Sequence, residues 1–88
     1  MNINKLNNLV ANSISVQKDL VGDFLHSIDP GKYAARDLFE MYQRSEYAPD
    51  LTSARLFDFC MNNLQREFHP RIAFKIRKRA MPVEWIIR

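Results

Sequence analysis

Histidine, cysteine and carboxylate side chains are the groups through which this chain of 88 residues could catalyse a reaction or bind a metal ion. His26 and His69 are far apart in the sequence, and neither has a cysteine or carboxylate at the spacing of metal ligands. Cys60 falls on the inward face of a predicted helix, where a cysteine behaves as a small core hydrophobe. The sequence therefore predicts that the protein is not an enzyme and has no metal and no cofactor.

Positive charge gathers at the C-terminal end of the sequence. Residues 66–88 contain seven basic and two acidic side chains, a net charge of +5, whereas residues 1–65 contain six basic and eight acidic ones, a net charge of −2. Five of the cations lie between Arg71 and Arg79, which is more than an edge hairpin needs to resist aggregation. The asymmetry indicates an anionic partner for this end of the chain, either nucleic acid or an acidic protein surface.

Apolar residues at helical spacing predict helices over residues 16–28, 33–45 and 53–66. Ser13 or Ser15 is the expected N-cap of the first helix, and Thr52 or Ser53 that of the third. Tyr42 is expected in the core with its hydroxyl at the rim. The inward face of the third helix is one of two sets: Leu56, Phe59, Cys60 and Leu64, or Phe57, Met61 and Leu64.

After Pro70 the apolar period changes from that of a helix to that of a strand. Two alternating runs joined by "KRAMP" predict an antiparallel hairpin whose apolar face packs on the helices. Trp85 is expected to anchor the hairpin in the core; if exposed instead, it would bind a partner by stacking. The expected apolar face consists of Ile72, Phe74, Ile76, Val83, Trp85 and Ile87.

Residues 1–14 are interpreted as an N-terminal helical extension of a single domain over residues 15–88. The extension has a narrow apolar stripe, residues 3–10, which either caps the core of its own chain or forms a homodimer with a second copy. A single cysteine, no signal-like apolar run and no stretch of membrane-spanning length favour a cytoplasmic protein away from the membrane.

Three helices followed by a hairpin is the order of a winged helix-turn-helix, so the predicted fold class is α+β, mainly α with a C-terminal β-hairpin. In that fold the third core helix enters the major groove of duplex DNA, and the hairpin, or wing, contacts the backbone. The alternative for the helix residues is a solvated face without a partner. The candidate nucleic-acid-binding residues are Arg55, Asn62, Asn63, Arg66, Arg71, Lys75, Arg77, Lys78 and Arg79.

Several short motifs point the same way. "DLFEMY" is an aromatic-rich helix, "TSARLFDF" and "NNLQREF" form a Ser/Thr-capped helix, and "FKIRKR" and "VEWIIR" are a basic and an aromatic strand. Through these motifs residues 33–88 resemble the winged-helix domains of the regulatory factor X type and the C-terminal winged helix of phage and plasmid primase-helicases. The resemblance implies a viral or mobile-element DNA-binding protein that acts in transcription regulation or as a replication accessory.

A second hypothesis comes from a different class of protein. The net negative charge of residues 1–65 favours a small phage-type inhibitor that binds an acidic host protein through its basic hairpin. Nuclease treatment distinguishes the two hypotheses, because a protein partner remains bound after nucleic acid is digested.

Overall fold

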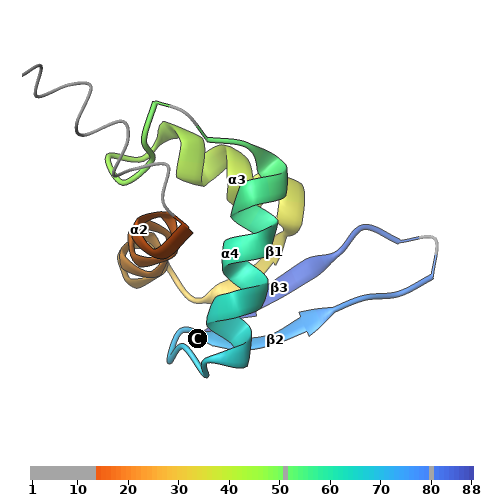
Figure 1. The fold of residues 1–88 in the computed structure, drawn as a ribbon. Helices are drawn as coiled ribbons and strands as arrows, with labels where there is room; N and C mark the ends of the chain where they lie inside the picture. Colours follow the sequence, from red (N-terminus) through yellow and green to blue (C-terminus); the bar gives the residue numbers. More distant parts are fainter. Residues whose placement is uncertain (1–13, 51, 80) are drawn as a thin grey trace, which may run out of the picture.

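The computed structural model describes residues 14–50, 52–79 and 81–88. These residues form an α+β fold with three helices and a three-stranded antiparallel sheet, whose last two strands extend away from the helices (Figure 1). The predicted extension and its apolar stripe lie outside the described residues, apart from Ile14 at the start of the first helix. The elements are α2 (Ile14–Ser27), β1 (Gly31–Ala34), α3 (Ala35–Arg44), α4 (Ala54–Arg66), β2 (Ile72–Ile76) and β3 (Glu84–Ile87).

The helix ends follow capping and turn residues. The hydroxyl of Ser53 accepts a hydrogen bond from the N–H of Leu56 at 3.1 Å, so Ser53 and not Thr52 is the N-cap of α4. Ser15, one of the two expected caps of α2, lies inside the helix, and Ser13 lies outside the described residues. The predicted helices over residues 16–28 and 53–66 are confirmed to within two residues at each end.

The prediction of a helix from residue 33 is wrong at its start, because Gly31–Ala34 form the strand β1. β1 pairs antiparallel with β3, with Tyr33 opposite Trp85, and the order of strands in the sheet is β1-β3-β2. Tyr33 is the one large apolar residue of this segment, so the segment has no alternating pattern of its own. This segment is a strand because it pairs with β3, which lies about 50 residues later in the chain.

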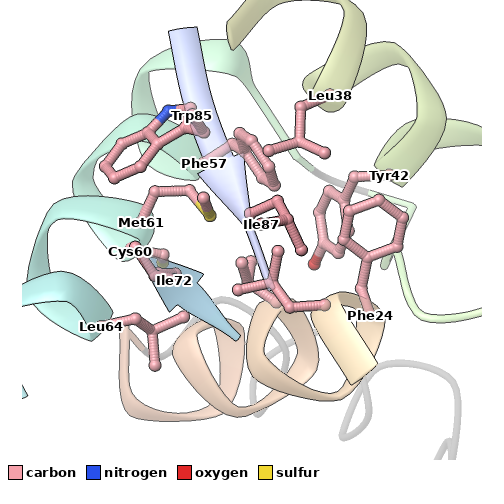
Figure 2. Close-up of a cluster of buried hydrophobic side chains, with 12 residues drawn as sticks. Phe24, Leu38, Tyr42, Phe57, Cys60, Met61, Leu64, Ile72, Trp85 and Ile87 are labelled. Atoms are coloured by element: carbon pink, nitrogen blue, oxygen red, sulfur yellow. The ribbon is translucent and has the colours of Figure 1, made fainter. Parts of the chain in front are cut away.

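Side chains from all three helices and the sheet enclose a hydrophobic core (Figure 2). Phe24 of α2, Tyr42 of α3 and Phe57 of α4 pack ring against ring. The ring centroids of Phe24 and Tyr42 are 5.3 Å apart, and those of Tyr42 and Phe57 are 5.1 Å apart. Trp85 of β3 is 1% exposed and packs into the same core, which confirms its predicted burial.

The hydroxyl of Tyr42 does not lie at the rim of the core, as the sequence predicts, but inside it. The side chain is fully buried, and its oxygen has no hydrogen-bond partner in the described part of the chain. Burial, together with a smaller effect of the neighbouring Cys60, raises the pKa of Tyr42 to about 12. Three large rings meet at this position, which draws the whole tyrosine inward.

A β-bulge in β2 decides which hairpin side chains face the helices. Ala73 is the extra residue at the register shift, and beyond it Lys75 lies opposite Trp85. Phe74 lies opposite Ile86. Because paired residues project from the same face of a sheet, Lys75 shares the face of Trp85 and Phe74 points to the other side, where it is 53% exposed. The predicted inward position of Phe74 is therefore wrong.

The buried face of α4 combines residues from the two predicted sets. Phe57, Met61 and Leu64 point into the core, as one of the two predicted sets has it, together with Cys60 from the other set. Phe59, which the other set places inward, is 47% exposed. Cys60 is buried as predicted, and burial raises the pKa of its thiol.

The C-terminal end of α4 is a Schellman motif, in which two backbone N–H groups bond back to the last turn. The N–H of His69 donates to the C=O of Leu64 at 2.9 Å, and that of Phe68 donates to the C=O of Gln65 at 3.1 Å. Phe68 occupies the position that glycine usually takes and has a φ of 59°. This left-handed backbone costs a residue with a Cβ about 1–2 kcal/mol. Its side chain is 90% exposed, so burial does not offset that cost.

Candidate nucleic-acid interface

The helix α4 and the hairpin strand β2 form an open groove of about 440 Å³. Its lining includes four of the residues that the sequence predicts to bind nucleic acid: Asn62, Arg66, Lys75 and Arg77. Gln65 also lines the groove, and its position three residues after Asn62 on the helix could have identified it. The side chains of Arg66, Lys75 and Arg77 give the groove a positive potential.

Lys75 links the hairpin to α4. Its Nζ donates a hydrogen bond to Oδ1 of Asn62 at 2.8 Å and lies 5.0 Å from the centroid of the Trp85 ring. Burial, and after it the charge of Arg77, lowers the pKa of Lys75, while Asp58 acts in the opposite direction. The ammonium group therefore holds the hairpin in place as well as contributing charge to the groove.

Both asparagines of α4 make hydrogen bonds within the protein. Asn62 accepts the bond from Lys75, and Nδ2 of Asn63 donates to the C=O of Phe59 at 2.8 Å. Oδ1 of Asn63 accepts a bond from Nη2 of Arg66 at 3.4 Å. Recognition of adenine by asparagine uses both the oxygen and the nitrogen of the amide. Each asparagine therefore already uses part of the amide that would read a base in that way, and the remaining lone pair and N–H groups are what it could offer.

Arg71 lies at the junction of α2 and the hairpin and does not line the groove. Its Nη2 donates to the C=O of Ile28, directly after α2, at 2.5 Å, and its backbone N–H donates to Nδ1 of His69 at 3.1 Å. Its own C=O accepts a bond from the N–H of Arg88 at 2.8 Å. The structure thus gives this candidate phosphate-binding residue a role in attaching the hairpin to the first helix.

Arg77 of the groove and the three candidate cations not yet placed are exposed. Arg77, Lys78 and Arg79 follow β2, on the part of the hairpin that extends beyond the helices (Figure 1). Arg55 lies in the first turn of α4. The ion pairs within the described ranges involve none of these four cations. Their charges are therefore available to an anionic surface without a competing carboxylate.

His26 and His69, which the sequence does not relate to each other, meet between α2 and the end of α4. Their ring centroids are 4.9 Å apart. A Cβ on Gly22 would lie 3.4 Å from Nε2 of His69, at the limit of ordinary van der Waals contact, so the imidazole packs directly against α2. Across residues 14–50, 52–79 and 81–88, no group of three or more His, Cys, Asp or Glu side chains is arranged to hold a metal ion.

The environment of His69 makes the stability of the fold depend on pH. Burial lowers the pKa of His69 below its ordinary value of 6.5, and the charges of His26 and Arg71 lower it further, against opposing effects of a Gly22 backbone hydrogen bond and Asp23. The unfolded chain therefore binds more protons than the folded one once the pH falls below about 6.5. The stability contribution of the neutral imidazole is present above that pH and is lost as the pH falls through the folded pKa.

We expect the midpoint of urea unfolding to fall between pH 7 and pH 5, more steeply in the wild type than in a His69→Gln variant. The measurement is a set of urea titrations across this pH range, with His26→Gln as the matched control. Removal of His26 takes away one charge that lowers the pKa of His69, so this control should keep a smaller pH dependence. Equal slopes in all three proteins would contradict the prediction.

Within the described residues, no helix is long and apolar enough to span a bilayer. Comparisons of the chain with protein-family models, with curated proteins and with solved structures found no match.

Proposed function

We propose that this protein is a small winged-helix protein that binds duplex DNA, as a regulator or replication accessory of a phage or mobile element. The observation that carries the proposal is the run of exposed cations Arg77, Lys78 and Arg79, which form no ion pair within the described residues, on a hairpin that extends beyond the helices (Figure 1). The hairpin lies beside α4, and three polar residues of the helix line the groove between them: Asn62, Gln65 and Arg66. In a winged helix this pair of elements meets the DNA.

The charge pattern of the two elements supports contact with phosphates in particular. Arg55 and Arg66 are eleven residues apart on α4, a rise of roughly 16 Å, and lie within about 20° of each other around the helix axis. The two guanidinium groups therefore lie on the same side of α4, where both side chains are exposed and can contact phosphates of one duplex. Together with the three hairpin cations, they supply sequence-independent affinity.

The proposal is tested by the binding of random-sequence duplex DNA, measured by fluorescence anisotropy at two salt concentrations. A protein that makes about five phosphate contacts should bind roughly 500-fold more weakly at about 200 mM than at about 50 mM salt. Affinity that does not change with salt, or no binding by the folded protein at low salt, would overturn the proposal.

A second candidate function is the binding of an acidic host protein through the same hairpin. It is favoured by two apolar side chains that DNA phosphates cannot use, since Phe74 is 53% exposed and Met81 is 58% exposed. Capture from a host lysate before and after nuclease treatment tests it, because a specific protein partner should be retained after digestion. Loss of all captured protein on digestion would exclude it.

A further inference from the structure

Phe68 is a strained residue whose side chain contributes almost nothing to the fold. Its φ of 59° belongs to the left-handed region, and its ring is 90% exposed at the end of α4. Glycine takes this position of a Schellman motif without strain. The positive φ itself belongs to the helix cap, but neither the cap nor the core requires an aromatic side chain here, because the ring is exposed and glycine would adopt the same φ without strain. Strained positions of this kind are often found at binding sites.

A second pocket, of about 350 Å³, opens beside Phe68. Its apolar lining comes from Phe68, Pro70, Ile72 and Ala73. The polar groups are Gln65, His69 and Arg88, of which His69 already accepts a bond from Arg71. This volume is near the lower end of the range for small-ligand sites, about 300–1,000 Å³, and suits one flat ring system.

The pocket adjoins the groove between α4 and β2. Gln65 lines both, so the two depressions lie on either side of a single side chain. Arg66 and Arg77 bring positive charge to the groove side, and Arg88 brings it to the pocket side. A nucleic-acid strand whose phosphates follow the groove therefore brings a neighbouring nucleotide to the ring of Phe68.

We infer that Phe68 and this pocket bind an unpaired base next to the duplex that α4 and the hairpin hold. The inference rests on the proposed function and extends it, because the preferred ligand becomes a junction of double-stranded and single-stranded DNA. An exposed aromatic ring stacks on any base, since every base has a π face. Gln65 offers a donor and an acceptor to the base edge, and Arg88 offers a cation to its phosphate.

The test compares a blunt duplex with the same duplex carrying a short 5′ or 3′ single-stranded overhang, by anisotropy at one low salt concentration. The wild type should bind one of the overhang duplexes about 5- to 150-fold more tightly than the blunt one, the range that corresponds to stacking of a single base. Phe68→Gly should bind all three duplexes equally. Phe68→Trp should keep the preference, because indole also stacks.

The matched control is Phe74→Ala, which removes an aromatic ring that is also exposed, at 53%, but does not line the pocket. This variant should keep the preference for the overhang. Thermal unfolding provides a second readout, since Phe68→Gly relieves the left-handed strain and should raise the melting temperature by roughly 4 °C. Weaker overhang binding by a more stable protein then reports a lost contact and not a damaged fold.

The outcomes separate the two proposals. A wild type that binds blunt and overhang duplexes with equal affinity would overturn the pocket proposal and leave the proposed function intact. A folded wild type that binds neither duplex would overturn the proposed function, and the pocket proposal with it. Equal loss of the overhang preference in Phe74→Ala and Phe68→Gly would also contradict a specific role for Phe68.

Discussion

A variant with alanine at Arg77, Lys78 and Arg79 should lose most of its affinity for duplex DNA at low salt. These three cations are exposed and follow β2 on the hairpin. If each of them neutralises one phosphate, the slope of log K against log salt decreases by about 2.7. The loss of affinity should then be roughly 40-fold larger at about 50 mM than at about 200 mM salt. Anisotropy titrations of the wild type and the variant at both concentrations measure the two slopes.

The control for net charge is a variant with alanine at Lys32, Arg36 and Arg44. These residues are also exposed, but they belong to β1 and α3 and do not line the groove. Both triple variants remove three positive charges, and surface changes of this kind alter stability by about 0.5 kcal/mol or less each. An equal loss of affinity in the two variants would indicate attraction by overall charge and contradict contact through the hairpin.

Replacement of Trp85 by alanine should lower the free energy of unfolding by about 3–5 kcal/mol. Trp85 is 1% exposed and belongs to the core that the helices and the sheet share. A chain of this size has a total stability of roughly 4–13 kcal/mol, so this substitution removes between about a quarter and all of it. Urea unfolding followed by far-ultraviolet circular dichroism measures the change, since the variant lacks the tryptophan that fluorescence would report.

Two neighbouring variants separate burial from other effects of the substitution. Trp85→Phe should cost much less, because it keeps a ring in the core and removes an indole N–H that has no hydrogen-bond partner among the described residues. Ile86→Ala changes the next residue of β3, which is only half-buried, and should also have a small effect. A midpoint of Trp85→Ala equal to that of Ile86→Ala would show that the tryptophan does not anchor the hairpin.

The parts of the fold that depend on local pattern could be predicted from the sequence. The helical period, the Asp29-Pro30-Gly31 turn and the cap at Ser53 locate α2 and α4, because these signals act within a few residues. The strand β1 could not be found in this way, since Tyr33 gains its pairing from Trp85 near the other end of the chain. The bulge at Ala73 was also not predicted, because large apolar residues recur at every second position in this part of the sequence and so give no sign of an inserted residue.

The candidate site was predictable to the extent that charge alone determines it. The cluster of charges at Arg77, Lys78 and Arg79 can be read directly from the sequence. The bonds that occupy Asn62, Lys75 and Arg71 join residues distant in sequence, and only the packing of the hairpin on the helices brings them together. The left-handed backbone of Phe68 lies beyond sequence reasoning for a different reason, because aromatic residues rarely adopt it.

The order of the strands in the sheet has a consequence for synthesis on the ribosome. β3 is the central strand, although it is the last of the three along the chain. At translation rates of about 5–20 residues per second, β1 waits roughly 3–10 s for its pairing partner to be made. During that interval the helices can pack in pairs, but Gly31–Ala34 and Ile72–Ile76 still lack the strand that joins them. A nascent chain therefore completes its sheet in a single late step, when residues 84–87 leave the ribosome.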